Sequence, residues 1–394
     1  MSASVLQVRG RILRGPDDVV DELWVVDGRL TFERPAQAAA SDVETVDGWV
    51  LPGLVDAHCH VGLDSRGAVE PERAVEQALT DRDAGTLLIR DAGSPLDTRF
   101  VQEREDLPQL IRAGRHIART RRYIPNFAIE TELEHVVTYV RQQAALSDGW
   151  VKLVGDWIDR EVGDLAPCWP RSALELAVEA AHEEGARVTA HCFAEESLVD
   201  FAAAGVDCIE HATGLVPETV ETFARQGIAI VPTLVNIATF GDIAAAAEKK
   251  YPGYAAHMRD LHERRYDTIG AAHEAGVPIY VGTDAGGSLP HGLVAQEIAE
   301  LTKAGMTSLE AISAATWGAR EWLGREGLTE GAQADFVVYR DDPREDVRTI
   351  ADPHRIVLRG GSRVQAPLAT PRNPPPGGSH DRDGCRGVRR PRHR

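Results

Sequence analysis

The segment Val50-Leu-Pro-Gly-Leu-Val-Asp-Ala-His-Cys-His60 opens the part of the chain that decides the fold. Its apolar run ends in polar residues, which is typical of a buried strand whose carboxyl end reaches a site. From residue 53 to about residue 325, short apolar runs alternate with amphipathic stretches, and this rhythm predicts successive βα units. The predicted strands are residues 53–58, 86–90, 115–118, 150–154, 187–190, 208–210, 229–232 and 278–282. The predicted helices include residues 72–83, 133–145, 171–184, 196–204 and 217–226.

Eight βα units over residues 53–325 predict an α/β chain with a (β/α)₈ TIM barrel. A doubly wound open sheet is the alternative, but no GxGxxG sequence opens the first unit. Residues 1–52 and 326–368 carry β-type alternation, which predicts one small β-sandwich built from both chain ends. Residues 369–394 are rich in Pro, Gly and Arg and are expected to form a disordered basic tail, with a basic interaction tail as the alternative.

Composition narrows the class of partner. The chain has 394 residues and a net charge of −18, which argues against a nucleic-acid partner. It has no run of 18 apolar residues and no signal-peptide pattern at its start, so neither a membrane span nor secretion is expected. Five Cys without a CxxC pair indicate reduced thiols in a cytoplasmic protein. We expect a small-molecule substrate, and a homo-oligomer is compatible with the sequence.

Polar side chains gather at the predicted carboxyl ends of the strands. His58 and His60 lie two residues apart on one strand, so their imidazoles point the same way. His191, His211 and Asp284 end the predicted strands 5, 6 and 8. A single His is more often an ordinary core or surface residue, but this set suits Zn²⁺ or a similar divalent metal.

Lys152 is unusual both in its residue type and in its place. Only four of the 43 basic residues are Lys, and this one sits within the apolar strand Trp150-Val-Lys-Leu-Val154. Burial disfavours an ammonium, and a neutral amine can be carboxylated by CO₂ to a carbamate whose two oxygens bridge two cations. The alternative is a Lys paired with a carboxylate such as Asp284.

The chain resembles the metal-dependent amidohydrolase superfamily, and within it the branch of imidazolonepropionase-like proteins and Xaa-Pro dipeptidases (prolidases). The resemblance covers roughly residues 5–365 and rests on a set of segments in family order. These segments are 50–60, Trp150-Val-Lys-Leu-Val154, Val188-Thr-Ala-His191, Ile209-Glu-His211, Ile230-Val-Pro-Thr233, Ala275–Gly286, Ala311–Thr316 and Glu330–Asp335.

The resemblance implies a site with two divalent metal ions, Zn²⁺ being expected. It implies that His58 and His60 hold one metal and that His191 and His211 hold the other. Carboxylated Lys152 and a hydroxide would bridge the two ions. Asp284 would bind the first metal and shuttle the proton. Strand alternation predicts that Glu210, which precedes His211, faces the opposite side and is not a ligand.

Two loops depart from the family pattern and widen the choice of substrate. Many relatives carry Gly-Gly-His where this chain has Arg119-Thr-Arg-Arg-Tyr-Ile-Pro125, and Ser-Gly-Gly where it has Gly155-Asp-Trp157. Arg121, Arg122 or Tyr123 could meet a substrate carboxylate, and Trp157 could wall the pocket, although each is more often plain loop surface. His291, in Leu-Pro-His-Gly292, matches a feature of the branch and is a candidate substrate contact.

The sequence therefore favours a binuclear metal-dependent hydrolase that cleaves an amide or peptide bond, in a prolidase-like dipeptide or an N-acyl amino acid. The first rival is a single-metal aminohydrolase (deaminase), or a cyclic amide hydrolase acting on a ring substrate. Lys152 speaks against the deaminase, because such enzymes usually lack a lysine on strand 4. The second rival is a non-enzymatic scaffold, which the complete set of six ligand positions disfavours.

Overall fold

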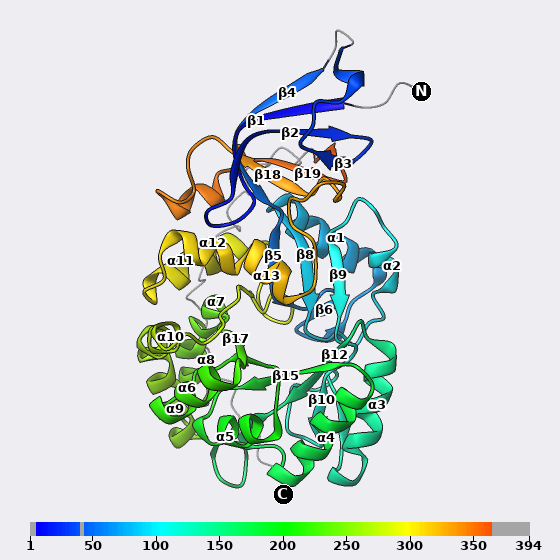
Figure 1. Ribbon diagram of the computed structural model, residues 1–394. Helices are drawn as coiled ribbons and strands as arrows, with labels where there is room; N and C mark the ends of the chain where they lie inside the picture. The colour runs from blue at the N-terminus through cyan, green and yellow to red at the C-terminus, as the bar shows by residue number, and fades with distance from the viewer. Residues whose placement is uncertain (1–4, 40–42, 365–394) are drawn as a thin grey trace, which may run out of the picture. The chain divides into compact units, whose positions relative to one another are not determined.

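The computed structural model describes residues 5–39 and 43–364. Both ends of this part of the chain contribute to one seven-stranded sheet (Figure 1). Strand β4 lies at its centre, parallel to β1 on one side and antiparallel to β18 on the other. The order across the sheet is β20 (Ser362–Arg363), β19 (Ile356–Arg359), β18 (Phe336–Tyr339), β4 (Glu44–Pro52), β1 (Val5–Leu13), β2 (Val19–Val26) and β3 (Arg29–Thr31).

Apolar side chains from the two ends share one small core on this sheet. Val8 of β1, Val50 of β4 and Phe336 of β18 are all fully buried in the same cluster. A composite unit from both chain ends was expected, whereas a second sheet packed face to face is not seen among the described residues. The sandwich therefore stays a prediction, and the tail expected at residues 369–394 lies outside the described residues.

The middle of the chain is a mixed α/β arrangement with two parallel sheets. Three of its strands, residues 54–59, 86–91 and 150–154, are buried along their whole length, as expected of parallel strands covered by helices. One sheet has the order β5 (Leu54–Cys59), β8 (Thr86–Asp91) and β9 (Gln109–Arg112). The other has the order β11 (Ile129–Thr131), β10 (Ile117–Arg119), β12 (Trp150–Val154), β15 (Arg187–Cys192), β16 (Cys208–His211) and β17 (Ala229–Val231).

The segment predicted as the eighth strand connects these two sheets without forming a regular strand. Ile279 makes a parallel bridge to Ile230 of β17, and Ala285 makes one to Cys59 of β5. The backbone leaves the extended conformation at Asp284, whose φ of 56° interrupts the ladder. Residues 279–285 thus lie between β17 and β5 and bridge to both strands. Full closure into an eight-stranded barrel stays a prediction.

The helices follow the expected rhythm up to β17. Several end at a glycine in the left-handed conformation, as at Gly205 and Gly227, where a residue with a Cβ would be strained. The helices are α1 (Pro71–Asp83), α2 (Arg99–Gln102), α3 (Val136–Leu146), α4 (Arg171–Glu183), α5 (Glu195–Ala204), α6 (Pro217–Gln226), α7 (Leu234–Ile237), α8 (Phe240–Ala247), α9 (Pro252–Glu263), α10 (Arg265–Glu274), α11 (Val294–Lys303), α12 (Ser308–Ala314) and α13 (Trp317–Trp322).

Short elements complete the described chain. They are the hairpins β6 (Leu63–Asp64) with β7 (Gly67–Ala68) and β13 (Asp156–Asp159) with β14 (Asp164–Pro167), and the 3₁₀ turns 36–39, 133–135 and 347–351. Among the described helices, none has the length and apolar character needed to cross a membrane. The four cysteines in the described part of the chain are buried free thiols.

Candidate metal centre

His58, His60 and Asp284 present three donor atoms to one point. The Nε2 atoms of His58 and His60 are 3.2 Å apart. Asp284 Oδ1 lies 3.2 Å from the first of these nitrogens and 3.0 Å from the second. Ligands about 2.0–2.1 Å from a shared Zn²⁺ would be separated by roughly 2.9–3.4 Å for bond angles between 90° and 109°. The three donor atoms could therefore hold a metal ion.

Each of the two imidazoles is oriented through its other nitrogen. His60 Nδ1 donates to the carbonyl oxygen of Gly93 at 2.7 Å. His58 Nδ1 lies 2.7 Å from Glu210 Oε2. Both contacts favour a proton on Nδ1, and Nε2 is then left with a free lone pair for a metal.

The position of Glu210 contradicts the expectation from strand alternation. Its carboxylate points into the interior, where it pairs with Arg90 at 2.7 Å and accepts a hydrogen bond from Thr189. The alternation fails because His211, the next residue, has a φ of 69°, so its side chain also turns toward the site. Burial alone would raise the pKa of Glu210, but the charge of Arg90 and the contact with His58 hold it well below the usual value.

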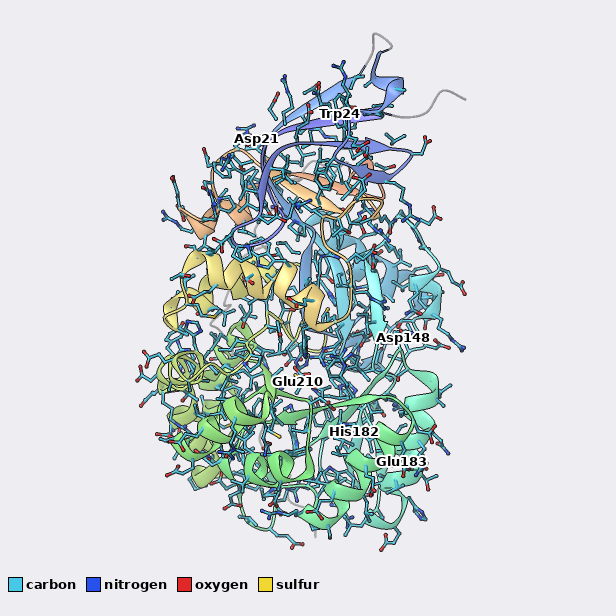
Figure 2. The ribbon with its side chains drawn as sticks, viewed as in Figure 1. Asp21, Trp24, Asp148, His182, Glu183 and Glu210 are labelled. Carbon is cyan, nitrogen blue, oxygen red and sulfur yellow. The ribbon has the colours of Figure 1, made fainter. Side chains whose placement is uncertain are left out.

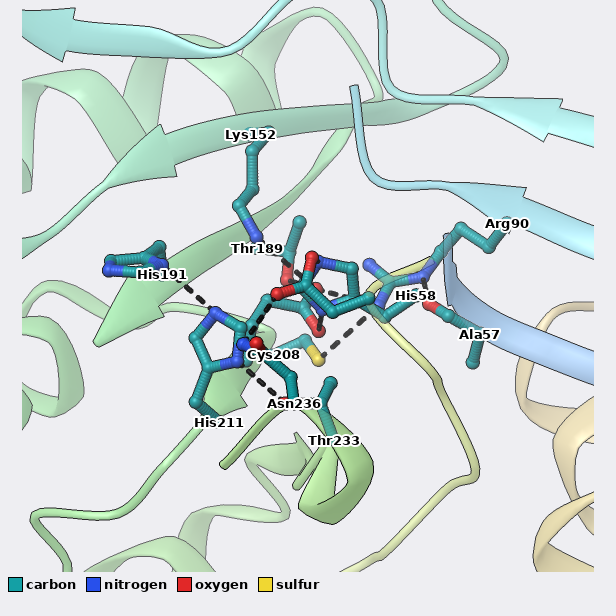
Figure 3. Close-up of polar contacts among 12 residues, drawn as sticks. Ala57, His58, Arg90, Lys152, Thr189, His191, Cys208, His211, Thr233 and Asn236 are labelled. Carbon is teal, nitrogen blue, oxygen red and sulfur yellow. Dashed lines mark hydrogen bonds and ion pairs between the residues drawn. The ribbon is translucent and has the colours of Figure 1, made fainter. Parts of the chain in front are cut away.

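His191 and His211 form a second pair of facing donors. His191 Nδ1 lies 2.9 Å from His211 Nε2. The Thr233 hydroxyl lies 2.7 Å from His211 Nδ1 and fixes that ring (Figure 3). Burial is the first cause that lowers the pKa of both imidazoles well below the usual value, so both are neutral at pH 7. Neutral imidazoles are the form that binds metals.

Lys152 reaches toward the same space from β12. Its side chain is 1% exposed, and Nζ has no hydrogen-bond partner in the described part of the chain. The nearest carboxylate contact is Glu210 Oε1 at 4.0 Å, so the alternative pairing with Asp284 is not the contact that forms. Figure 3 shows the side chain directed toward the space between His191 and His58. Burial lowers the pKa of the amine, which is the condition for reaction with CO₂.

Asp284 is held ionised and in a strained backbone conformation. Its Oδ2 accepts a hydrogen bond from Asn236 Nδ2 at 2.7 Å, which leaves Oδ1 to face His58 and His60. Burial would raise its pKa, but these imidazoles lower it well below the usual range. Its positive φ is shared by His211 and Thr233, and such strain in non-glycine residues gathers at functional sites.

An aromatic cavity of about 130 Å³ opens beside these donors. Tyr123 and Trp157, both expected near the substrate, line it together with His60, His191 and Asp284. Their rings meet edge to face with centroids 4.8 Å apart. Other lining residues are Leu63, Ile124, Phe127, Phe193, Asn236, Thr239, Phe240, Ile243, Gly286, Gly287 and Ser288. No Lys or Arg is among these lining residues.

Two other expected substrate contacts lie elsewhere. The guanidinium of Arg122 is bound to Asp159 and to the carbonyl oxygens of Trp157 and Ala166, so it braces the β13–β14 hairpin. His291 pairs with Asp81 of α1 and is not among the residues that line the cavity. The structure thus brings the six expected metal-site residues together, and it places two of the four expected substrate contacts at the cavity.

A family model described as the amidohydrolase family matches residues 49–361. The chain belongs to the amidohydrolase family. A relative from Mycobacterium tuberculosis, named as an uncharacterized protein, is 53% identical over 356 residues, which cover 90% of this chain and 95% of that one. The resemblance found in the sequence is therefore confirmed, and the chain is an amidohydrolase-family hydrolase.

Further amidohydrolases share the fold. Ochratoxinase from Aspergillus niger is 30% identical over 201 residues, which are 49% of this chain and 41% of the enzyme. Its crystal structure matches with a TM-score of 0.75 at 21% identity, covering 92% of this chain and 96% of that chain. A Xaa-Pro dipeptidase with bound methionine in the active site matches with a TM-score of 0.74 at 22% identity, covering 92% and 100%.

His116 is a member of this amidohydrolase site that the sequence analysis missed. It is fully buried, and its ring stacks on His60 with centroids 5.0 Å apart and planes 24° apart. The ring of Tyr123 is a second neighbour, with its centroid 5.6 Å from that of His116. Burial holds the pKa of His116 well below the usual value. The neutral ring thus supports the orientation of His60, and no spacing signal marked it.

Proposed function

We propose that this chain is a binuclear metal-dependent amidohydrolase that cleaves an amide or peptide bond in a small substrate. The observation that carries the proposal is the convergence of two donor groups, His58 with His60 and Asp284, and His191 with His211. Lys152 supports a carbamate between them, because its Nζ has no hydrogen-bond partner among the residues that the structure describes.

Lys152 would become a ligand through a balanced addition. The neutral amine attacks CO₂, a C–N bond forms, and the amine proton leaves to solvent. The product is an anion with two oxygen donors, whereas the free ammonium has none. The set would then contain four imidazoles, one carboxylate and one carbamate, which suits two Zn²⁺ ions.

When bound, the two cations polarise the substrate carbonyl and lower the pKa of a water molecule toward 7. Asp284 is the residue placed to move the proton. Its carboxylate is ionised at neutral pH and so has room for a proton, and Asn236 holds its other oxygen so that Oδ1 stays at the donor group. Asp284 accepts the proton of the attacking water and delivers it to the leaving nitrogen.

The cavity favours a substrate with an apolar or aromatic group. Tyr123, Trp157 and Phe193 offer aromatic surface, and the described lining residues include no Lys or Arg. A prolidase-like dipeptide and an N-acyl amino acid both stay within the proposal. Both carry a free carboxylate, so the lining separates them only through the apolar acyl group of the second, which would lie against the aromatic rings. The name of the related ochratoxinase is compatible with a small-molecule substrate.

The test is a hydrolysis screen of the metal-loaded protein against dipeptides, N-acyl amino acids, lactams and lactones. His60→Ala should abolish hydrolysis and lower metal uptake. The matched control is His182→Ala, on the outer helix α4, where the imidazole pairs with Asp207 (Figure 2). Unchanged metal content and activity in His60→Ala would contradict the assignment.

A single-metal aminohydrolase is the second candidate. The tight three-donor group of His58, His60 and Asp284 is complete without a second ion, and this observation favours it. Two results would establish this candidate instead. The protein would release ammonia from a cyclic substrate, and it would bind one metal ion that is lost in His60→Ala but kept in His191→Ala.

A further inference from the structure

Strand β5 carries polar groups on both of its faces. His58 and His60 face the metal centre, and Cys59 between them faces the opposite side. There Cys59 Sγ lies 3.5 Å from His291 Nδ1 and 3.8 Å from Asp81 Oδ2. Three elements that are distant in sequence therefore bring a sulfur, a nitrogen and an oxygen donor to one buried point.

The separations of these donors suit a tetrahedral zinc ion. With Zn–S of about 2.3 Å and Zn–N or Zn–O of about 2.0–2.1 Å, tetrahedral angles give S···N and S···O separations of roughly 3.6 Å and an N···O separation of roughly 3.4 Å. The two sulfur distances already agree within about 0.2 Å. His291 Nδ1 and Asp81 Oδ2, now hydrogen-bonded at 2.8 Å, would need to part by about 0.6 Å.

A further buried carboxylate, that of Asp91, lies near these three donors. Asp91 is paired in register with Cys59 across β5 and β8, so the two side chains leave the same face. Its Oδ2 is buried and has no hydrogen-bond partner in the described part of the chain, and the same holds for His291 Nε2. A buried group of this kind is stabilised when a cation compensates it.

A catalytic relay does not explain the same contacts. In such a relay the imidazole uses one nitrogen for the thiol and the other for the carboxylate. Here His291 turns Nδ1 to both Cys59 and Asp81. The thiol is also fully buried, so no substrate reaches it. Donors that converge on one point, rather than following one another in a chain, are typical of a metal site.

We propose that Cys59, Asp81 and His291 bind one structural Zn²⁺ ion, separate from the catalytic centre on the other face of β5. The Zn–S bond forms as the thiol proton leaves to solvent. The ion would tie β5 and α1 to the segment that precedes α11. That segment includes Gly286 and Gly287, which line the catalytic cavity, so the ion would fix one wall of the substrate site.

Cobalt substitution tests this proposal, because the catalytic donor set contains no sulfur. The full chain is stripped of metal with a chelator and titrated with Co²⁺. We expect a sulfur-to-cobalt charge-transfer absorption in the near ultraviolet and one metal equivalent beyond the catalytic content. Cys59→Ser should lose both, whereas Cys168→Ser, which alters another buried thiol, should keep both.

A second variant keeps the test decisive if Cys59→Ser fails to fold. His291→Gln retains the thiol but removes the imidazole donor, and it should weaken the Co²⁺ affinity of the sulfur-containing site by at least tenfold. Absence of the absorption in the wild-type protein would overturn the proposal. An absorption that persists in Cys59→Ser, or an unchanged affinity in His291→Gln, would also overturn it. A wild-type protein that shows the cobalt absorption but hydrolyses none of the substrates would contradict only the proposed function, and the structural metal site would stand.

Discussion

Replacement of Lys152 by Met should separate activity from stability. Among residues 5–39 and 43–364 the buried Nζ atom has no hydrogen-bond partner, and its nearest carboxylate oxygen there, on Glu210, is 4.0 Å away. At an effective dielectric constant of about 20, the attraction at this distance is about 4 kcal/mol. Removing an ammonium from water costs several kcal/mol, which offsets that attraction. Methionine fills a similar volume without a charge, so the free energy of unfolding of the metal-free protein should change by less than about 2 kcal/mol.

The same substitution should remove hydrolysis, because neither Met nor Arg can form a carbamate. Changes in groups that only orient a metal ligand cost 10–100-fold, so loss of a bridging ligand should cost at least about 100-fold. The assays are urea unfolding of the metal-free protein and turnover plus metal content of the loaded protein. In Lys152→Ala, short carboxylic acids should restore part of both metal content and activity.

Lys303→Met is the matched control, since that lysine lies on the surface paired with Glu300. Full activity of the metal-loaded Lys152→Met or Lys152→Arg protein would refute the bridging role. If metal-free Lys152→Met is destabilised by more than about 3 kcal/mol, the attraction to Glu210 does not nearly cancel the cost of removing the ammonium from water. Lys152 would then stabilise the fold through its charge.

Three further predictions concern other parts of the site and its surroundings. Thr233→Val should weaken metal affinity by about 10–100-fold in competition with a chelator, because the ring of His211 loses the hydroxyl that orients it; unchanged affinity would contradict this. Trp157→Ala should raise KM more than it lowers kcat, because it removes binding surface rather than a reacting group; the opposite split would argue for a role in the chemistry. The pKa of His257 is raised to about 9, first by its hydrogen bond to Glu195. Its contribution to stability should be complete below about pH 6.5 and lost as the pH rises through 9, amounting to about 1 kcal/mol after solvent screening; unfolding of His257→Gln should lack this dependence, and a wild-type stability that is flat from pH 6 to 10 would contradict it.

The parts of the site that could be predicted are those set by local sequence. His58 and His60 share a face because they are two residues apart on one strand, and this holds whatever surrounds them. Lys152 stood out because an apolar strand around a lysine indicates burial, and β12 has the predicted bounds. In both cases the residues that form the pattern and the residue that carries the chemistry are only a few positions apart in the sequence.

The parts that could not be predicted depend on backbone turns and on distant contacts. Strand alternation placed Glu210 on the wrong side because the left-handed conformation of His211 has no mark in the sequence. His116 joins the site through stacking on His60, 56 positions earlier in the chain. His291 was associated with the substrate by family pattern, yet its partner Asp81 is 210 positions away.

The central sheet of the terminal unit has a consequence for synthesis of the chain on the ribosome. Strand β4 is made among the first 52 residues, but its neighbour β18 begins only at Phe336. Until then one edge of β4 has no partner and the apolar side chains Val8 and Val50 lack the cover of Phe336. During most of translation the nascent chain therefore exposes an unpaired strand edge, which can pair with strands of other chains. A product truncated before residue 336 should therefore aggregate instead of folding, because the sheet is completed only when the last strands have been made.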